Sequence, residues 1–261
     1  MEIKNQVALV TGAASGIGYA YTKSLLENNV KVAICDINIE KCYATAKILA
    51  QKYDSKNIIA LHCDVTKDES FENAFKKCID QFKRLDIVIN NAGVFDESME
   101  NWILTMNINY GGVVRGTMLA IKYMSTYYGG NGGTVVQTSS IAGLMEKYHM
   151  APMYRSTKRA IIDYSRAVGD PRSFKYLNIR VMTICPGITD TPLMNEDRSN
   201  LYLIKEHYTH YKENTIKLPR QTPDKLGKGL IEILKHGKTG DCWIVENNEE
   251  PRLANIPDIP Y

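Results

Sequence analysis

The sequence predicts an α/β fold: a single doubly wound parallel sheet of about seven strands with helices on both faces. Three observations lead to this prediction. Short β-rich apolar runs recur along the chain, longer amphipathic stretches separate them, and the two kinds of segment alternate from end to end. Near-continuous hydrophobicity is what strands buried on both faces require, and strand–helix alternation gives parallel pairing through right-handed crossovers.

The expected strands are the short apolar runs at residues 7–10, 30–35, 58–63, 86–90, 134–138, 179–185 and 242–245. The amphipathic stretches between them are expected to form helices at about residues 18–28, 40–53, 70–82, 111–128, 154–176 and 222–235. Two segments depart from this rhythm. Residues 187–217 are long, polar and mixed, which fits a segment that covers a substrate. Residues 246–261 carry three prolines, which fits a loosely ordered C-terminal arm.

The length of 261 residues is compatible with one large domain or with two small ones. Because strand and helix alternate without a linker, a repeat or a low-complexity tract, we expect a single domain over residues 1–261. At 44% hydrophobic and 23% charged residues, the composition is typical of a soluble globular chain, which excludes disorder, collagen and coiled coil.

Charge and cysteine content limit the expected partners and compartment. The net charge of +3, from 32 basic and 29 acidic residues, gives no reason to expect nucleic acid or a membrane as a partner. The six cysteines lie far apart without metal-binding spacing, so we expect buried free thiols and no metal. A strand-like run begins at Val7, which leaves no room for a signal peptide, and no stretch approaches the ~20 apolar residues of a membrane helix. We therefore expect a cytoplasmic protein.

A glycine-rich turn, TGAASGIG at residues 11–18, follows the first expected strand and opens the first expected helix. Its glycines have the spacing GxxxGxG, in which the missing side chains permit a tight turn and let backbone N–H groups approach a pyrophosphate. The spacing alone is common by chance, so its place between a strand and a helix carries the argument. A purely structural turn is the alternative.

Asp36 ends the second expected strand. A carboxylate at this place accepts hydrogen bonds from the adenosine ribose of a dinucleotide and repels a 2′-phosphate. Its neighbours Ala13, Ala14 and Ile37 offer no cation to neutralise such a phosphate. The pattern predicts NAD rather than NADP, although an aspartate that only caps the next helix would give the same pattern.

Tyr154 and Lys158 stand four residues apart at the start of a predicted helix, which puts them one turn apart on the same face. A nearby cation lowers the pKa of a tyrosine, so that a phenolate can take the proton of an alcohol. The YxxxK spacing alone proves little, since it also starts at Tyr19, Tyr43 and Tyr208. Only Tyr154 follows the fifth strand and the serine turn at 139–140, at the sheet edge where open α/β folds bind ligands.

Taken together and in order, these motifs resemble the short-chain dehydrogenases/reductases. The set is TGAASGIG, the acid at 36, CDV at 63–65, NNAG at 90–93, the Ser-Ser turn, YRSTK at 154–158 and PG at 186–187. The matching motifs are closely spaced from residue 7 to about 191 and sparser beyond. RLDIVINNAGV, SSIAGLM and ICPGITDT are most similar to the 15-hydroxyprostaglandin dehydrogenase branch, and ICPGITDT and INYGG also resemble the insect alcohol dehydrogenase branch.

The resemblance implies a Rossmann-like fold, hydride transfer with NAD, and a homodimer or homotetramer packed through the helices at 111–128 and 154–176. It also implies catalytic roles for four residues. Tyr154 would be the acid/base, and Lys158 would lower its pKa and hold the nicotinamide ribose. Ser140 would orient the substrate, and Asn109 would support a proton-relay water, with Asn107 as the rival for that role.

The resemblance further implies which residues contact the ligands. Those expected at the cofactor are Gly12, Ala14, Ser15, Gly16, Ile17, Gly18, Asp36, Ile37, Asp64, Val65, Asn91, Ala92, Gly93, Tyr154, Lys158, Pro186, Gly187, Ile188, Thr189 and Thr191. Those expected at the substrate are Ser140, Met145, His149 and Tyr154.

The chain departs from the family pattern near the expected pocket. One residue more than is common separates Ser140 from Tyr154, so residues 145–152 carry an insertion. Three residues before its tyrosine, the prostaglandin branch has a glutamine that hydrogen-bonds a substrate hydroxyl. This chain has Ala151 at that position, so the hydrogen bond is lost unless Tyr148 or His149 takes the place of the glutamine. Flexible thioethers near the pocket suit a bulky apolar substrate or simply fill the core: Met145, Met150, Met153 and Met194. Polar contacts could come from Tyr202, His207, Tyr208, His210 and Tyr211.

The sequence therefore predicts an NAD-dependent dehydrogenase for a secondary alcohol or ketone on a medium-sized apolar substrate, such as an oxylipin or a steroid-like or terpenoid alcohol. A small-alcohol dehydrogenase of the insect type is the alternative. A catalytically idle nucleotide-binding protein is a third hypothesis, against which the complete set of four catalytic residues argues.

Overall fold

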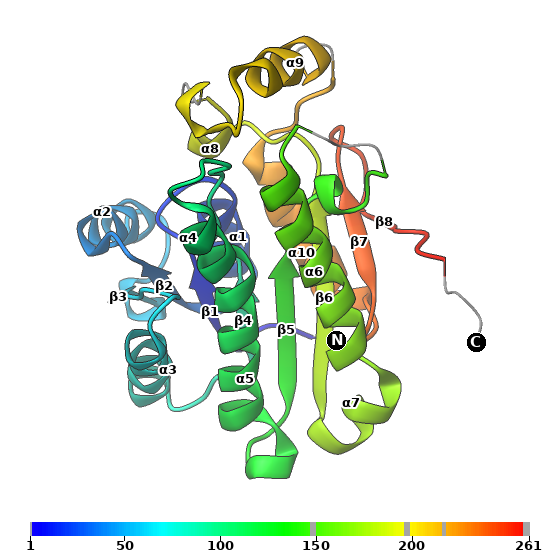
Figure 1. Cartoon of the computed structure of the whole chain (residues 1–261). Helices are drawn as coiled ribbons and strands as arrows, with labels where there is room; N and C mark the ends of the chain where they lie inside the picture. The colour runs from blue at the N-terminus through cyan, green and yellow to red at the C-terminus, as the bar shows by residue number, and fades with distance from the viewer. Residues whose placement is uncertain (1, 147–149, 196–198, 216–217, 258–261) are drawn as a thin grey trace.

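The computed structural model describes residues 2–146, 150–195, 199–215 and 218–257 (Figure 1). Over this part of the chain, eight strands form one sheet in the order β3-β2-β1-β4-β5-β6-β7-β8. They are β1 (Val7–Thr11), β2 (Lys31–Asp36), β3 (Ile58–His62), β4 (Ile87–Asn90), β5 (Gly133–Thr138), β6 (Ile179–Pro186), β7 (Cys242–Val245) and β8 (Arg252–Leu253). The first seven pair in parallel, as predicted, and β8 adds an antiparallel edge.

The winding of the sheet reverses between β1 and β4. From β1 the chain passes outward to β2 and β3, and it then returns to place β4 on the other side of β1, followed by β5, β6 and β7. β1 and β4 are buried along their whole length, which explains why these runs are apolar on both faces. In open α/β sheets, the crevice at the carboxyl ends of the strands beside such a switch point binds ligands.

Helices cover both faces of the sheet, which confirms the doubly wound arrangement. One layer is built from α1 (Gly16–Glu27), α2 (Ile39–Leu49) and α10 (Pro223–His236). The other is built from α3 (Asp68–Phe82), α5 (Gly112–Met124) and α6 (Pro152–Val168). Figure 1 shows α5 and α6 side by side in front of β5. Short 3₁₀ turns lie between elements at η1 (Ser55–Asn57), η3 (Thr126–Tyr128) and η4 (Ile141–Gly143).

The helix predicted at 111–128 starts earlier and is interrupted. It consists of α4 (Trp102–Met106), a π-helical turn η2 (Asn107–Gly111) and α5. A π-turn inserts a residue into a helix and often marks a functional site. The apolar periodicity of α5 was visible in the sequence, but the inserted turn has no composition signal of its own.

The helix predicted at 154–176 is two helices, α6 and α7 (Pro171–Leu177). Pro171 divides them, because proline has no N–H to donate inside a helix and its ring clashes with the preceding turn. The same residue suits the first position of α7, where Asp170 caps the helix by accepting the N–H of Arg172.

The segment predicted at 187–217 contains α8 (Pro192–Asn195), η5 (Ser199–Leu201) and α9 (Lys205–Thr215). Figure 1 places α8 and α9 above the carboxyl ends of the strands. The C-terminal arm is only partly the loose segment that its prolines predicted. Its residues Arg252 and Leu253 pair with β7, because the edge of β7 offers unpaired backbone groups.

The six cysteines are buried and form no disulfide, as expected. None of the helices in the described ranges is long and apolar enough to cross a membrane.

Candidate active site

The glycine turn between β1 and α1 has a backbone that only glycine adopts easily. Gly12 and Gly16 have φ angles of +61° and +57°. At Gly18, a Cβ would lie 2.3 Å from the carbonyl oxygen of Gly12. The three glycines are therefore required by the turn itself, and the missing side chains leave room for a ligand to approach its backbone.

Thr11, the last residue of β1, and Asn91, directly after β4, hold this turn. The Thr11 hydroxyl accepts the N–H groups of Asn91 (3.0 Å) and Ala92 (3.1 Å). The side-chain amide of Asn91 donates to the carbonyls of Thr11 (3.0 Å) and Gly12 (3.3 Å). These contacts join β1 to β4 across the switch point.

The first turn of α1 is open at its N-terminus. Ser15 occupies the N-cap position, but its side chain makes no capping hydrogen bond. The first N–H groups of a helix have no partners inside the helix, and the helix dipole adds a partial positive charge there. With the glycine turn beside it, this helix start offers a site for an anion such as a pyrophosphate.

Asp36 joins the glycine turn to the start of α2. One of its carboxylate oxygens accepts the N–H of Ala14 (3.3 Å) and the other accepts the N–H of Asn38 (3.1 Å). Lys41, in the first turn of α2, lines the same cavity as Asp36. Only the positions next to Asp36 were predicted to lack a cation, so Lys41, which follows Asp36 by five residues, was missed.

α6 carries Tyr154 in its first turn and Lys158 one turn later, on one face of the helix as the spacing predicted. Lys158 Nζ lies 5.5 Å from the centroid of the Tyr154 ring. It donates a hydrogen bond to the carbonyl of Thr138, at the end of β5 (3.0 Å). Burial lowers the pKa of Lys158 to about 8. The end of β5 therefore holds this amine beside the tyrosine.

Asn109 lies in the π-helical turn and is fully buried, whereas Asn107 is exposed. Its Oδ1 accepts the N–H of Val94 (2.8 Å), and its Nδ2 donates to the carbonyl of Val94 (2.9 Å). A Cβ placed on Gly93 would lie 3.3 Å from Asn109 Oδ1 and 3.5 Å from Lys158 Nζ. Of the two asparagines, only Asn109 therefore reaches the loop beside the lysine.

The two serines after β5 have different surroundings, although both line the cavity. The Ser139 hydroxyl donates to the carbonyl of Lys158 (2.7 Å) and so holds α6 against the strand end. The Ser140 hydroxyl accepts the N–H of Ala142 (3.1 Å) and remains able to donate its own proton. This difference favours Ser140 as the group that meets a substrate.

These elements surround one cavity of about 1090 Å³ at the carboxyl edge of the sheet. It is larger than the ~300–1,000 Å³ typical of small-molecule sites. The expected cofactor contacts that line it are Gly12, Ser15, Gly16, Ile17, Asp36, Asn91, Ala92, Gly93, Tyr154, Lys158, Pro186, Gly187, Ile188, Thr189 and Thr191. The expected substrate contacts that line it are Ser140, Met145 and Tyr154.

The other expected contacts lie outside the cavity lining: Ala14, Gly18, Ile37, Asp64 and Val65. The Asp64 carboxylate accepts the N–H (2.9 Å) and the hydroxyl (2.7 Å) of Thr66, and Val65 is buried. The contact of Asp64 and Val65 with the cofactor stays a prediction. His149 and Tyr148 lie outside the described residues.

Aromatic rings form one wall of the cavity. The centroid of the Phe95 ring lies 5.4 Å from that of Tyr154 and 5.0 Å from that of Tyr202. The centroid of the Tyr202 ring in turn lies 5.4 Å from that of Tyr208 and 5.9 Å from that of Tyr211. Tyr202, Tyr208 and Tyr211 were among the candidates, but Phe95 was missed, although it directly follows the NNAGV motif.

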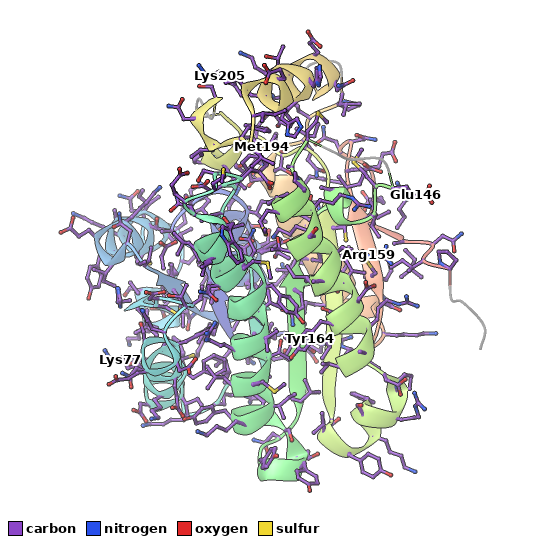
Figure 2. The ribbon with its side chains drawn as sticks, viewed as in Figure 1. Lys77, Glu146, Arg159, Tyr164, Met194 and Lys205 are labelled. Carbon is purple, nitrogen blue, oxygen red and sulfur yellow. The ribbon has the colours of Figure 1, made fainter. Side chains whose placement is uncertain are left out.

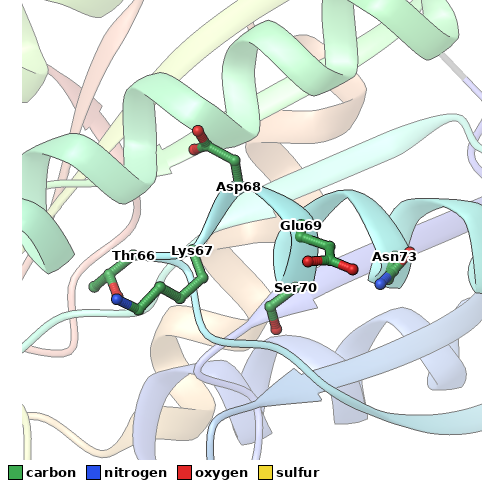
Figure 3. Close-up of a pocket in the computed structure, with 6 residues that line it drawn as sticks. All are labelled: Thr66, Lys67, Asp68, Glu69, Ser70 and Asn73. Carbon is green, nitrogen blue, oxygen red and sulfur yellow. The ribbon is translucent and has the colours of Figure 1, made fainter.

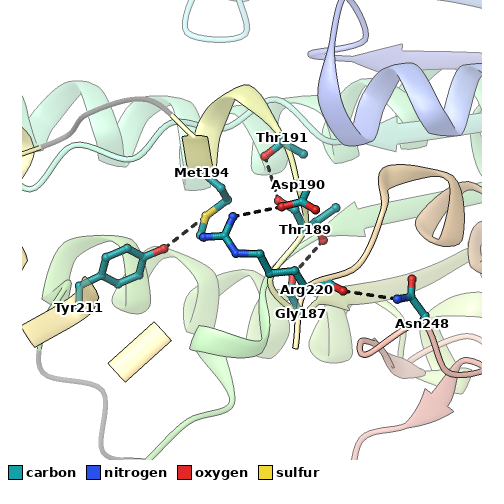
Figure 4. A network of polar contacts seen from close by, with 8 residues as sticks. All are labelled: Gly187, Thr189, Asp190, Thr191, Met194, Tyr211, Arg220 and Asn248. Atoms are coloured by element: carbon teal, nitrogen blue, oxygen red, sulfur yellow. Dashed lines mark hydrogen bonds and ion pairs between the residues drawn. The ribbon is translucent and has the colours of Figure 1, made fainter. Parts of the chain in front are cut away.

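Polar contacts join the segment at 187–217, above the cavity, to residues that follow it in the chain (Figure 4). Arg220 forms an ion pair with Asp190 (3.1 Å), and the carbonyl of Arg220 accepts the side-chain amide of Asn248 (3.4 Å). The Tyr211 hydroxyl lies 3.7 Å from the Met194 sulfur, and both residues line the cavity. Figure 2 shows Met194 near the upper end of α6, with Tyr164 farther down that helix.

A second hollow lies at the start of α3 (Figure 3). It is lined by Thr66, Lys67, Asp68, Glu69, Ser70 and Asn73, all from one stretch of chain. None of the candidate catalytic residues reaches it, so the large cavity is the candidate active site.

A model of the short chain dehydrogenase family matches residues 6–201. The chain is 35% identical to the 15-hydroxyprostaglandin dehydrogenase [NAD(+)] of Rattus norvegicus over 237 residues, which cover 90% of this chain and 88% of that protein. It is 28% identical to alcohol dehydrogenase 1 of Ceratitis cosyra over 248 residues, which cover 94% and 93% of the two chains. These matches confirm the resemblance that the motifs indicated.

Solved structures share the fold at low sequence identity. A short chain dehydrogenase/reductase from Burkholderia phymatum in complex with NAD has a TM-score of 0.79 at 16% identity, covering 95% of this chain and 90% of that one. A 3-ketoacyl-(acyl-carrier-protein) reductase from Brucella melitensis complexed with NADH has a TM-score of 0.76 at 21% identity, covering 94% and 97%. The predicted fold class is thus confirmed, with eight strands in place of seven.

Proposed function

The chain belongs to the short-chain dehydrogenase family, and we propose that it is an NAD-dependent oxidoreductase. In this proposal, a hydride moves between the nicotinamide and a secondary alcohol or ketone on a medium-sized apolar substrate. The observation that carries the proposal is the single cavity in which the glycine turn, Tyr154 and Lys158 meet. A dinucleotide cradle and an acid/base group that open into the same space are what hydride transfer requires.

NAD fits the residues at the α1 side of the cavity. The open start of α1 would hold the pyrophosphate, and the Asp36 carboxylate would accept hydrogen bonds from the adenosine ribose. At the other side, Lys158 would hold the nicotinamide ribose, and residues 186–191 would cover the ring. When bound, the nicotinamide supplies the acceptor or donor of the hydride. The rat relative is named as an NAD(+) enzyme, and two of the similar solved structures hold NADH or NAD, which supports this cofactor.

Tyr154 takes the hydroxyl proton of the alcohol in oxidation and returns it in reduction. The protonated amine of Lys158, 5.5 Å from the ring centroid, lowers the pKa of Tyr154 and so raises the fraction of phenolate that can accept a proton at neutral pH. The Ser140 hydroxyl donates to the substrate oxygen and orients it. Asn109, which like Lys158 lies beside Gly93, supports a water through which the proton leaves.

The substrate part of the cavity favours an apolar molecule larger than a short alcohol. Phe95 and Tyr202 continue the wall from the ring of Tyr154, and Met145 and Met194 contribute thioethers. Aromatic and thioether groups bury apolar surface and adapt to irregular shapes. Oxylipins and steroid-like or terpenoid alcohols have the required combination of an apolar body and a secondary hydroxyl.

The segment at 187–217 covers this substrate in the proposal, since α8 and α9 lie above the carboxyl edge and Tyr202, Tyr208 and Tyr211 line the cavity. The whole chain acts as one domain. A homodimer or homotetramer would pack through α5 and α6, and the exposed side chain of Met118 on α5 is consistent with this.

A small-alcohol dehydrogenase remains the second candidate, because the chain is 28% identical to the Ceratitis cosyra enzyme named alcohol dehydrogenase 1. A substrate screen separates the two. The purified chain is assayed with NAD⁺ and with NADP⁺ on propan-2-ol, 2-octanol, a hydroxylated fatty acid and a hydroxysteroid, by NADH or NADPH absorbance.

We expect turnover with NAD⁺ and a higher kcat/KM for the larger alcohols. A preference for propan-2-ol would favour the small-alcohol enzyme. Tight NADH binding without turnover of any alcohol would favour the idle nucleotide-binding protein.

A further inference from the structure

Glu97 is an acidic side chain beside the cavity that the proposed reaction does not use. It lies in the loop between β4 and α4 and is only 4% exposed. Both of its carboxylate oxygens accept backbone N–H groups at the start of α6, from Met153 (2.8 Å) and from Tyr154 (2.6 Å). A carboxylate is almost never buried without partners, and these two N–H groups are the partners.

The start of α6 has no cap of its own. Ala151 occupies the N-cap position and offers no side-chain acceptor. A helix normally receives such an acceptor from Ser, Thr, Asp or Asn at this place. Here the acceptor comes from Glu97, 57 residues before Tyr154. Because one of the two N–H groups belongs to Tyr154 itself, the carboxylate is hydrogen-bonded directly to the backbone of the proposed acid/base.

Glu97 is also hydrogen-bonded to the segment at 187–217, above the cavity. Its backbone N–H donates to the carbonyl of Leu201 (2.7 Å). Two residues earlier, the ring of Phe95 contacts the rings of both Tyr154 and Tyr202. Residues 95–97 therefore touch the first turn of α6 on one side and residues 201–202 on the other.

The charge of Glu97 is matched to the helix that it caps. Burial raises the pKa of the Glu97 carboxyl, the two N–H groups oppose that change, and Asp96 adds to it. The positive end of the α6 dipole favours the ionised form. A glutamine at this position could accept only one of the two N–H groups, because its NH₂ group is a donor that would face the other.

We propose that Glu97 is a positioning residue that fixes Tyr154 and joins it to the segment that covers the substrate. The inference rests on the proposed function, since it assumes that Tyr154 is the acid/base. Glu97 acts through the backbone of Tyr154, so its removal should lower the rate of proton transfer more than it lowers cofactor binding.

The test compares Glu97→Gln with Asp170→Ala. Asp170 is the control because its carboxylate also caps a helix, α7, by accepting the N–H of Arg172 (2.8 Å), and because it does not line the cavity. Each variant is assayed for Tm, for NADH Kd, and for kcat and KM on the alcohol of the screen that the wild type oxidises fastest. Both should lower Tm. Only Glu97→Gln should lower kcat, by about 10- to 100-fold, the scale of a misplaced catalytic group, with NADH Kd within about twofold of wild type.

Hydrogen exchange gives a readout that needs no substrate. In Glu97→Gln, amides at residues 153–156 and 199–204 should exchange faster than in wild type, while Asp170→Ala should leave them unchanged. Adding Ala151→Ser to Glu97→Gln supplies a local cap and should restore part of the protection and part of kcat.

A Glu97→Gln kcat within about twofold of wild type, or equal losses of kcat in both variants, would overturn the positioning role. Unchanged exchange at residues 153–156 would also overturn it. Failure of the proposed function looks different, because the wild type and Asp170→Ala would then oxidise none of the alcohols.

Discussion

Two helices begin at the wall of the same cavity, and their first turns are completed in opposite ways. At α1 the N-cap Ser15 makes no side-chain capping bond, and the glycine turn leaves the helix start open. At α6 the N-cap Ala151 has no side-chain acceptor, but the buried Glu97 carboxylate accepts the N–H groups of Met153 and Tyr154. One helix start is therefore available to an anionic ligand, and the other already holds an anion that belongs to the protein.

This difference matches the chemistry proposed for each helix. A helix start binds a phosphate through N–H groups that no protein group occupies. A catalytic tyrosine needs a fixed backbone instead, and a satisfied first turn provides it. Four experiments each disturb one of these two helix starts, in order of decreasing expected effect.

The largest effect is expected from Tyr154→Phe on the α6 side. Loss of the phenol removes the acid/base and should lower kcat by about 10²–10⁴-fold, the usual contribution of such a group. The NADH Kd from fluorescence titration should stay near that of wild type, because the α1 side is untouched. Tyr43→Phe is the control, since Tyr43 also precedes a lysine by four residues but is exposed and lies outside the cavity lining. Unchanged turnover in Tyr154→Phe would contradict the assignment.

The second effect concerns the charge on α6. Burial lowers the pKa of Lys158 from 10.5 to about 8, so below pH 8 the folded protein carries a buried cation that destabilises it. Between pH 8 and 10.5 the folded state has lost a proton that the unfolded state retains, and stability rises with pH. Relative to Lys158→Met, the free energy of unfolding of the ligand-free wild type should therefore rise by about 3 kcal/mol across this range.

Urea unfolding at several pH values measures this difference for both proteins. Groups that titrate in both chains cancel in the comparison. A flat difference between the two curves would show that Lys158 keeps its ordinary pKa in the fold.

The third effect breaks the α1 side. In Gly18→Ala the new Cβ would lie 2.3 Å from the carbonyl oxygen of Gly12 and 2.7 Å from Asn91 Nδ2. The turn must shift, at a cost of about 1–3 kcal/mol typical of overpacking. Since the turn is the proposed pyrophosphate site, NADH Kd should rise about 5- to 150-fold, by the same free energy. An NADH titration that matches wild type would separate the turn from cofactor binding.

The smallest effect is expected from Asp36→Ala at the edge of the α1 side. Loss of the carboxylate should weaken NAD⁺ binding by about tenfold, the equivalent of one charge-assisted hydrogen bond, and should relax discrimination against NADP⁺. Ratios of kcat/KM for the two cofactors measure it. Lys41→Ala, at the same wall of the cavity, should leave NAD⁺ use nearly unchanged and lower any use of NADP⁺. A wild-type preference for NADP⁺ would refute the cofactor assignment.

The strands and the glycine turn could be predicted because their causes are local. A strand buried on both faces must be apolar throughout, and a positive φ at Gly12 and Gly16 selects glycine. The choice between Asn107 and Asn109 came from the family resemblance, and the structure places only Asn109 beside Lys158. No local pattern indicates the π-turn that brings it there.

Glu97 and Phe95 could not be predicted, because their importance lies in contacts with distant segments. Nothing near residue 97 in sequence shows that Ala151 leaves α6 without a cap, and nothing near residue 151 shows that Glu97 supplies one. The YxxxK pair that starts at Tyr208 also depends on contacts between distant segments. Tyr208 and Lys212 reach the cavity because α9 lies above the carboxyl edge of the sheet.

Residues close together in the chain were enough to predict the alternation of strands and helices, the glycine turn and the Tyr154–Lys158 pair. Tertiary structure decided which tyrosines and cations share the cavity, that β8 completes the sheet edge, and that a carboxylate from one loop caps the helix of another. These features depend on distances between segments far apart in the sequence, and such distances are set only when the sheet and its two helix layers have packed.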